Sequence, residues 1–175
     1  MKTLRCIIGS CLLSLSFLLI AHSAMAQHPA WLNHTNGDKV TDILNDGDHL
    51  WVATTGGLVK LHKTSGEKTF YNRANANLPD NLPLSLAKDN DGSIWIASRF
   101  YGIGRLHVGG CQIFNRQNSG LPSDQLNSTV AIDVQGNKWF GSLGFLTKFD
   151  GSEWQSWQVA NPIFSHQSIN SILIR

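Results

Sequence analysis

The sequence predicts an all-β protein built from repeated blades of four antiparallel strands, which is a β-propeller architecture. Trp51, Trp95 and Trp139 are spaced 44 residues apart, within the similar phrases H-L-W-V-A-T-T, S-I-W-I-A-S and N-K-W-F-G-S. A period of about 40–50 residues with one aromatic residue per unit is typical of radial or stacked repeats. Helical periodicity is absent after the first 26 residues, so the repeat unit is read entirely as strands.

Each unit contains signals for four short strands. An apolar strand comes first, followed by an Asp/Asn/Gly cluster that favours a hairpin turn, and then by the tryptophan strand. A third strand follows glycine and carries one basic residue, and a fourth strand leads to the connector. Four antiparallel strands in about 44 residues make one propeller blade. The first strands are expected to begin at Val40, Leu84 and Ser128, and the fourth at Phe70, Ile113 and Trp154.

Two connectors between units are nearly the same phrase, N-R-A-N-A-N-L-P and N-R-Q-N-S-G-L-P. Proline after leucine favours an extended or turn conformation, which suits a crossover to the next unit. The expected blades are therefore about 36–78, 79–121 and 122–165. We expect the repeated tryptophans to fill the wedge between neighbouring sheets, and a sugar-stacking role is the alternative.

The run from L-P-S-D-Q-L-N to F-L-T-K-F-D-G resembles the two-component regulator propeller repeat. The family pattern has a Leu-Pro connector, a small apolar strand, Asp-x-x-Gly-Asn/Ser, a tryptophan strand, and then Gly-Leu with a basic–apolar pair. Three copies cover residues from about 36 to 160, and the first departs in its turn, N-D-G-D. The resemblance implies a periplasmic sensor domain of a hybrid two-component system, a group whose members often respond to carbohydrates.

The first 26 residues have the pattern of a secretory signal peptide. Lys2 and Arg5 precede an apolar run, and Ala24-Met25-Ala26 predicts a cut before Gln27, hence a periplasmic or secreted protein. No later segment is apolar for long enough to predict a membrane span. The remaining residues carry 12 basic and 12 acidic side chains, which gives no electrostatic case for nucleic acid. Cys111 is then the lone cysteine, so no disulfide framework is expected.

The repeats suggest a ring that is incomplete within this sequence. Residues 30–34 resemble a fourth strand placed before the first blade, and I-N-S-I-L-I-R echoes L-N-S-T-V-A-I as the start of a fourth blade at 166–175. Closed propellers have at least about four blades. We therefore expect an N-terminal part of a longer sensor, whose partners are missing C-terminal blades and an output domain, or else self-association. An isolated chain is expected to self-associate or aggregate through its open strand edges.

The sequence offers no catalytic or cofactor motif, and we expect neither enzyme activity nor a metal. The histidines have no metal-ligand spacing, and Gly102-Ile103-Gly104 lacks the third glycine of a nucleotide-binding fingerprint. The two glutamates, Glu67 and Glu153, fall in expected outer hairpins. This placement argues against the least favoured alternative, a propeller-based lyase or glycosidase.

A departure from the repeat marks the candidate ligand site. The loop Ser98–Gly102 between the second and third strands is one residue longer than its counterpart in the first unit. It places a guanidinium beside two aromatic rings, a combination that suits a carboxylated or sugar-like ligand. The alternative is that the rings only cap the blade edge. The candidate ligand-binding residues are Arg99, Phe100 and Tyr101, with Arg73 and Arg116 of the connectors as secondary candidates.

These observations favour a non-catalytic, exported ligand sensor, and the family resemblance implies that its ligand is a glycan. A structural or protein-interaction scaffold without a small ligand is the alternative.

Overall fold

The computed structural model describes residues 37, 39–126, 129–159 and 169–174. The chain divides into two units, Met1–Leu32 and Asn33–Arg175, and every described residue belongs to the second. The expected signal peptide, its cut before Gln27 and the strand expected at 30–34 lie outside the described residues.

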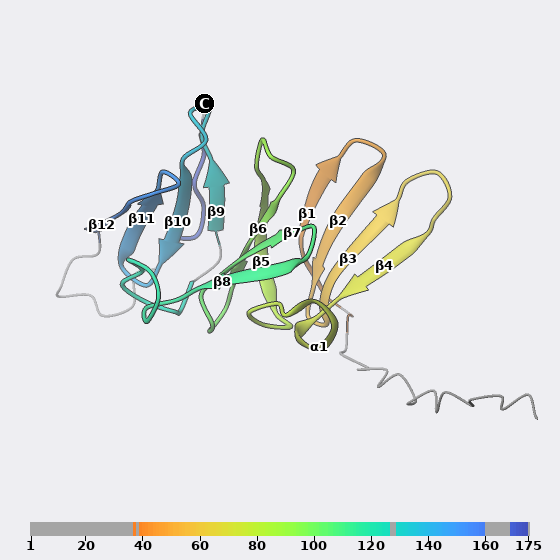
Figure 1. Cartoon of the computed structure of the whole chain (residues 1–175), viewed down its shortest axis with the longest axis horizontal. Coiled ribbons are helices and arrows are strands. Elements are labelled where there is room, and N and C mark those ends of the chain that lie inside the picture. Colours follow the sequence, from red (N-terminus) through yellow and green to blue (C-terminus); the bar gives the residue numbers. More distant parts are fainter. Residues whose placement is uncertain (1–36, 38, 127–128, 160–168, 175) are drawn as a thin grey trace, which may run out of the picture. The chain divides into compact units, whose positions relative to one another are not determined.

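The described residues form three four-stranded antiparallel sheets, each made from strands consecutive in sequence (Figure 1). We call them blades 1, 2 and 3. Blade 1 comprises β1 (Val40–Asp46), β2 (His49–Thr54), β3 (Gly57–His62) and β4 (Lys68–Tyr71). Blade 2 comprises β5 (Pro83–Lys88), β6 (Ile94–Ser98), β7 (Ile103–His107) and β8 (Gly110–Phe114). Blade 3 comprises β9 (Thr129–Ile132), β10 (Lys138–Ser142), β11 (Phe145–Phe149) and β12 (Trp154–Gln158). The all-β, four-stranded blade architecture expected from the sequence is confirmed.

The first hairpin of each blade follows from its turn residues. In blade 1, Asp46 pairs with His49 across a two-residue loop, and Gly47 has φ of +57°. In blade 2, the amide of Gly92 donates to the carbonyl of Asp89, and the left-handed φ of +84° at Gly92 returns the chain to β6. A turn followed by a left-handed glycine is a common longer hairpin. The turn N-D-G-D of the first repeat, which differs from the family pattern, is thus a shorter loop at the same position of the blade.

The connector between blades 1 and 2 contains one helical turn, α1 (Arg73–Ala76). Sequence periodicity indicated no helix, because a single turn is too short to show a period of 3.6 residues. The Asn72 side chain accepts from the amides of Ala74 and Asn75, and the Asn75 side chain accepts in return from the Asn72 amide, which forms a capping box. Asn115 begins the second connector with the same kind of turn, and accepts from the amides of Gln117 and Asn118.

The hydrophobic core lies between blades, where the repeated tryptophans pack. Trp51 of blade 1 is 7% exposed and Trp95 of blade 2 is 1% exposed. The Trp51 cluster includes the blade 2 residues Leu86, Ile94, Ile96, Leu106 and Cys111. The Trp95 cluster includes the blade 3 residues Val130 and Phe140. Each ring therefore fills the space towards the following blade.

The innermost strands are joined by hydrogen bonds between blades. The hydroxyl of Thr41 donates to the carbonyl of Pro83 at 2.6 Å, and the amide of Leu86 donates to the carboxylate of Asp42 at 2.7 Å. Between blades 2 and 3, the amide of Val130 donates to the hydroxyl of Ser85 at 3.3 Å. These bonds add directional contacts to the apolar packing and so help to fix the register of adjacent blades.

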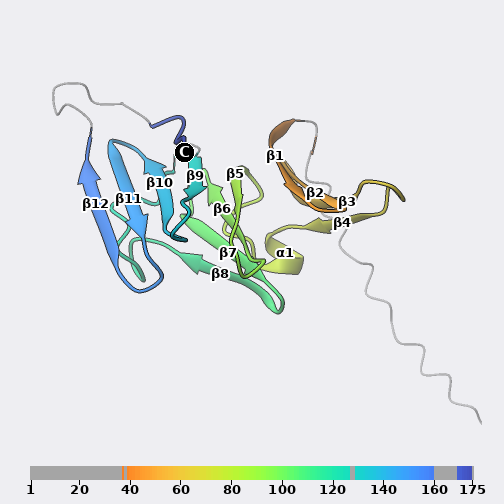
Figure 2. The ribbon, with the colours of Figure 1, turned by 90° about the horizontal axis from the view of Figure 1, so that it is seen from above.

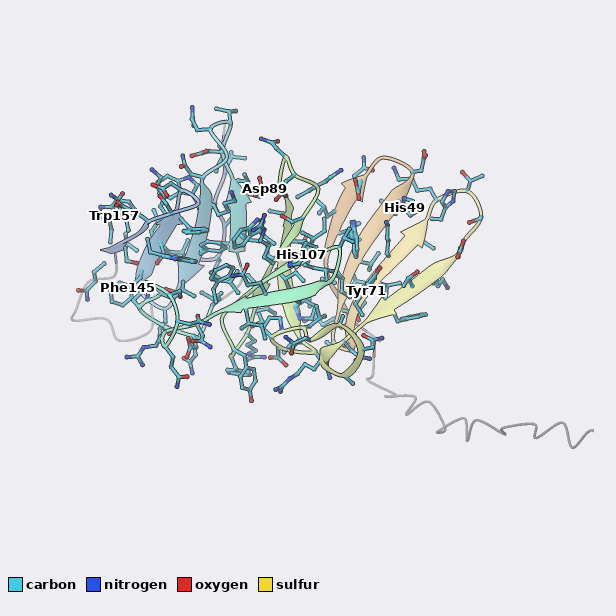
Figure 3. The ribbon with its side chains drawn as sticks, in the orientation of Figure 1. His49, Tyr71, Asp89, His107, Phe145 and Trp157 are labelled. Atoms are coloured by element: carbon cyan, nitrogen blue, oxygen red, sulfur yellow. The ribbon has the colours of Figure 1, made fainter. Side chains whose placement is uncertain are left out.

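Each repeated tryptophan donates to an aspartate of its own first hairpin. The acceptors of Trp51, Trp95 and Trp139 are Asp46, Asp89 and Asp133, at 3.0, 3.1 and 2.9 Å. Each indole also stacks or tilts against a fourth-strand aromatic ring of its own blade. The three partners are Tyr71, Phe114 and Trp157. Tyr71 and Trp157 are labelled in Figure 3. The tryptophan is thereby anchored at its polar edge, while its ring remains available for packing against the next blade.

Two of these aspartates also bind a lysine of the following blade. Asp46 pairs with Lys88, and Asp89 pairs with Lys138 at 2.8 Å. The Asp89–Lys138 pair is buried, with the two residues 8% and 9% exposed. Burial acts to raise the pKa of Asp89, but the bonds from Lys138, the Asn90 amide and Trp95 outweigh it and hold the pKa below its usual value.

Residues 169–174 form no strand, although the sequence echo predicts the first strand of another blade there. They run beside β9 in both ribbon views (Figures 1 and 2). Ile169 lies against Gly141 of β10, so closely that a methyl group on Gly141 would meet its Cβ at 2.9 Å. This segment therefore occupies the inner end of the tryptophan-bearing face of blade 3.

Candidate functional site

The blade connectors and the loops between second and third strands lie at one end of the blades. In blade 2 the β6–β7 loop begins after Ser98, whose hydroxyl donates to the Gly102 carbonyl at 2.7 Å. The amide of Gly102 donates in turn to the carbonyl of Asp124 in the β8–β9 connector at 3.0 Å. The longer loop is thus fastened to the neighbouring connector, and its side chains Phe100 and Tyr101 are exposed.

This end of blade 2 contains an open pocket of about 290 Å³. The guanidinium of Arg73, from α1, lies 5.0 Å from the centroid of the Tyr101 ring. Tyr101 is 50% exposed, so its ring can contact a ligand. A cation held against an accessible aromatic face offers both stacking and charge. The lining residues are Arg73, Pro79, Tyr101, Ile113, Asn115, Gln117 and Asp124.

Asp124 supplies a carboxylate to the pocket, which the sequence analysis missed. One of its oxygens, Oδ1, accepts from the backbone amide of Arg116 at 2.7 Å. In the preceding connector, Asn81 accepts from the amide of Arg73 at 2.8 Å in the same way. Asn81 and Asp124 are 43 positions apart, as are the two arginines. Comparing the two connectors residue by residue would have revealed a neutral residue in one and an acid in the other.

The five candidate residues are brought together only in part. Arg73 and Tyr101 share the pocket, whereas the Arg99 guanidinium lies over the Phe100 ring at 5.1 Å and neither residue lines it. The neighbours of Arg116 line the pocket, but Arg116 itself does not. The structure therefore brings two of the five candidates together at one site. The other three lie within two positions of a residue that lines this pocket.

A second pocket, of about 460 Å³, lies at the opposite end of blades 2 and 3. Its charged groups already bind each other: Asp91 pairs with Arg105, and Asp89 pairs with Lys138. The Arg105 guanidinium also lies 5.8 Å from the Trp95 centroid. These internal pairings indicate an interface between blades rather than a prepared ligand site.

Within the described ranges, no group of three or more His, Cys, Asp and Glu residues is arranged to hold a metal ion. His49 and His62 meet edge to face at 4.9 Å on blade 1, and His107 is exposed in the β7–β8 hairpin. None of the helices among these residues is both long and apolar enough to cross a membrane.

The family model described as two component regulator propeller matches residues 77–100. This segment includes the Leu-Pro connector, the β5–β6 hairpin and Trp95. The chain contains a two component regulator propeller repeat. The family resemblance stated from the sequence is thereby confirmed, with the match confined to this segment, and a comparison with curated proteins finds no match.

Solved structures with similar folds include two extracellular domains from B. thetaiotaomicron. That of the putative hybrid two component system BT3049 is 23% identical, with a TM-score of 0.60 over 69% of this chain and 17% of that one. That of BT4673, described as a putative one component or hybrid two component system, is 23% identical, with a TM-score of 0.62 over 75% and 18%. The chain therefore spans less than a fifth of either structure, and the likeness establishes the propeller fold.

Proposed function

We propose that this chain is the ligand-receiving part of an extracytoplasmic sensor and that it acts without catalysis. Residues 77–100 match the repeat, and the fold is similar to extracellular domains of two signalling systems. The signal-peptide pattern of residues 1–26 supports export to the periplasm or beyond. The output of such a sensor would be supplied by other parts of the signalling protein.

The Arg73–Tyr101 pocket is the observation that carries this proposal. An exposed aromatic ring offers a stacking surface for a pyranose or another flat apolar face, and Arg73 offers two parallel donors to a carboxylate. Asn115, Gln117 and the second oxygen of Asp124 surround them with hydroxyl-binding groups. This chemistry suits a small hydroxylated ring that bears an acid group, such as an acidic saccharide.

The composition of the pocket also favours binding over hydrolysis. Glycoside hydrolysis generally uses two carboxyl groups, one on each side of the scissile bond. Among the described residues that line this pocket, Asp124 alone is acidic. Glu67 and Glu153 precede β4 and β12, in the hairpins that join the third and fourth strands of their blades. A propeller-based hydrolase is accordingly the weaker explanation of the site.

Calorimetric titration of the purified chain with neutral and uronic-acid oligosaccharides tests the proposal. We expect the acidic sugars to bind, and Tyr101→Ala and Arg73→Gln each to weaken binding by at least about tenfold, or about 1.4 kcal/mol. Phe100→Ala is the matched control, because Phe100 lies in the same loop, is similarly exposed and does not line the pocket. Binding that is unaffected by Tyr101→Ala, or no binding of either sugar class, would overturn this assignment.

A further inference from the structure

The tryptophan-bearing face of blade 3 is the least covered of the three. We call the face that carries the repeated tryptophan the tryptophan face of a blade. In blades 1 and 2 this face is covered by the next blade, and Trp51 and Trp95 are buried. In blade 3 the corresponding Trp139 is half-buried, and Trp157, stacked on it at 5.9 Å, is 44% exposed. This pair of large rings has the composition of an interface between blades.

The opposite face of blade 1 has the composition of the face that receives a tryptophan. In blade 2 the receiving face presents Leu86, Ile94, Ile96 and Leu106, all buried against Trp51. Strand register places Ile43, Leu50, Val52 and Leu61 of blade 1 at the equivalent positions. Here the same apolar pattern is accessible: Ile43 is 57% exposed, and Phe70 in the same cross-strand row is 60% exposed.

The two open faces also hold the separated halves of an ion pair. Asp46 and Asp89 each bind a lysine of the following blade. Among the described residues, Asp133 of blade 3 accepts only from uncharged groups of its own blade: the Trp139 indole, the Asn137 side chain and backbone amides. On blade 1, the Lys63 ammonium donates to the Asn45 side chain and the Gly47 carbonyl, both uncharged acceptors.

Lys63 lies where a cation for Asp133 of a second copy would be needed. Asn45 directly precedes Asp46, as Lys88 directly precedes Asp89, so Asn45 and Lys88 are equivalent residues of their blades. In blade 2, Lys88 binds Asp46 of the preceding blade from this position. The hydrogen bond from Lys63 to Asn45 places an ammonium group at the equivalent position of the blade 1 receiving face. The open faces thus match in both apolar pattern and charge.

We propose that a second copy of this chain docks its blade 1 receiving face onto the tryptophan face of blade 3. Head-to-tail contacts close when the rotation between copies completes a ring. The described residues of two copies together form six blades, a number within the range of about 4–8 for closed propellers. The closed assembly is a symmetric dimer with two identical interfaces, each repeating the contact between blades 1 and 2.

The proposed docking requires residues 169–174 to leave their place on blade 3. Because Ile169 lies against Gly141, at the inner end of the tryptophan face, it holds the place that β1 of the second copy would take. The segment must therefore move aside when the dimer forms. Deleting residues 169–175 is expected to strengthen the dimer, which distinguishes this arrangement from association through a face that the segment does not touch.

Sedimentation velocity over a range of protein concentrations tests the proposal. We expect a reversible monomer–dimer equilibrium, weakened at least about tenfold by Ile43→Asp on the receiving face and by Trp157→Asp on the tryptophan face. Val108→Asp is the matched control, since Val108 is fully exposed in the β7–β8 hairpin and belongs to neither face. Circular dichroism of each variant at low concentration confirms that the monomer is folded.

Mixing the two disabled variants decides the orientation of the contact. The Ile43→Asp chain keeps an intact tryptophan face, and the Trp157→Asp chain keeps an intact receiving face, so the mixture should form a heterodimer with one interface. A face-to-face dimer of blade 1 would not be restored by mixing and would overturn the proposal, as would a wild-type chain that stays monomeric. Neither result depends on sugar binding, which therefore tests the proposed sensor function separately.

Discussion

The indole nitrogen of Trp95 and the carboxylate of Asp89 form a 3.1 Å hydrogen bond within blade 2. The same oxygen, Oδ2 of Asp89, lies 2.8 Å from the ammonium of Lys138 in blade 3. One carboxylate oxygen therefore orients the core tryptophan of its own blade and neutralises a buried cation of the next. This atom therefore links the two blades through one hydrogen bond and one ion pair, beside the apolar packing of the Trp95 cluster.

Asp89→Asn is expected to destabilise the fold by about 3 kcal/mol, because it leaves the ammonium of Lys138 buried without an opposite charge. Urea unfolding, followed by tryptophan fluorescence, measures the change. Asp91→Asn is the control: its pair with Arg105 is about half exposed, and asparagine keeps an oxygen that can accept from Ser93, so the loss should stay within about 1 kcal/mol. Equal effects of the two substitutions would contradict the special position of Asp89.

Stability is expected to fall on acidification between about pH 4 and pH 2. Hydrogen bonds from the hydroxyl and amide of Ser93 lower the pKa of Asp91 from 3.8 to about 2. Burial acts to raise the pKa of Asp133, but bonds from Trp139 and Asn137 outweigh it and also hold it at about 2. The folded state binds protons at these two carboxylates more weakly than the unfolded state does. The stability that the carboxylates contribute is therefore complete above about pH 4 and is lost as pH falls through 2.

Thermal melts at a series of pH values measure this dependence, and NMR titration of Asp91 in Ser93→Ala tests its cause. We expect the variant to shift the pKa of Asp91 upwards, since the hydroxyl bond is lost. A melting temperature that stays constant between pH 4 and pH 2.5 would count against these bonds as a source of stability.

Cys111 is expected to react slowly with thiol reagents while the protein is folded. Burial raises the pKa of its thiol to about 12, so very little thiolate is present at neutral pH. Mass spectrometry after a brief iodoacetamide treatment should show little labelling under native conditions and complete labelling in denaturant. Rapid native labelling would show that the interface between blades 1 and 2 opens readily, because Cys111 lies in the Trp51 cluster.

The blade architecture could be predicted because each strand and turn leaves a local signal. Trp51 recurs at a fixed spacing, and glycine marks the turns. The inter-blade pairs could not be predicted in this way, because Lys88 and Lys138 occupy different positions of their repeats and meet their acids only after the sheets pack. Helix α1 escaped prediction because one turn has no period.

The candidate site was predictable to a similar degree. The extra residue in the Ser98–Gly102 loop pointed to Tyr101, and the repeated connector pointed to Arg73. The sequence did not indicate that Arg99 stays on Phe100, outside the pocket, because that depends on the direction of each side chain. Asp124 was missed because the connectors were recognised by the residues they share, whereas this acid stands at a position where they differ.

Lys88 and Lys138 come from different strands of their blades, which affects how a chain of such repeats can gain or lose units. Lys88 ends the first strand of its blade, whereas Lys138 begins the second, yet each neutralises the hairpin acid of the blade before it. Blade 2 or blade 3 could therefore follow any unit that carries such an acid at the hairpin after its first strand. Duplication of blade 2 or blade 3, or loss of blade 2, would leave each acid between two blades with a counter-ion. Evolution could thus vary the number of units without first rebuilding their boundaries.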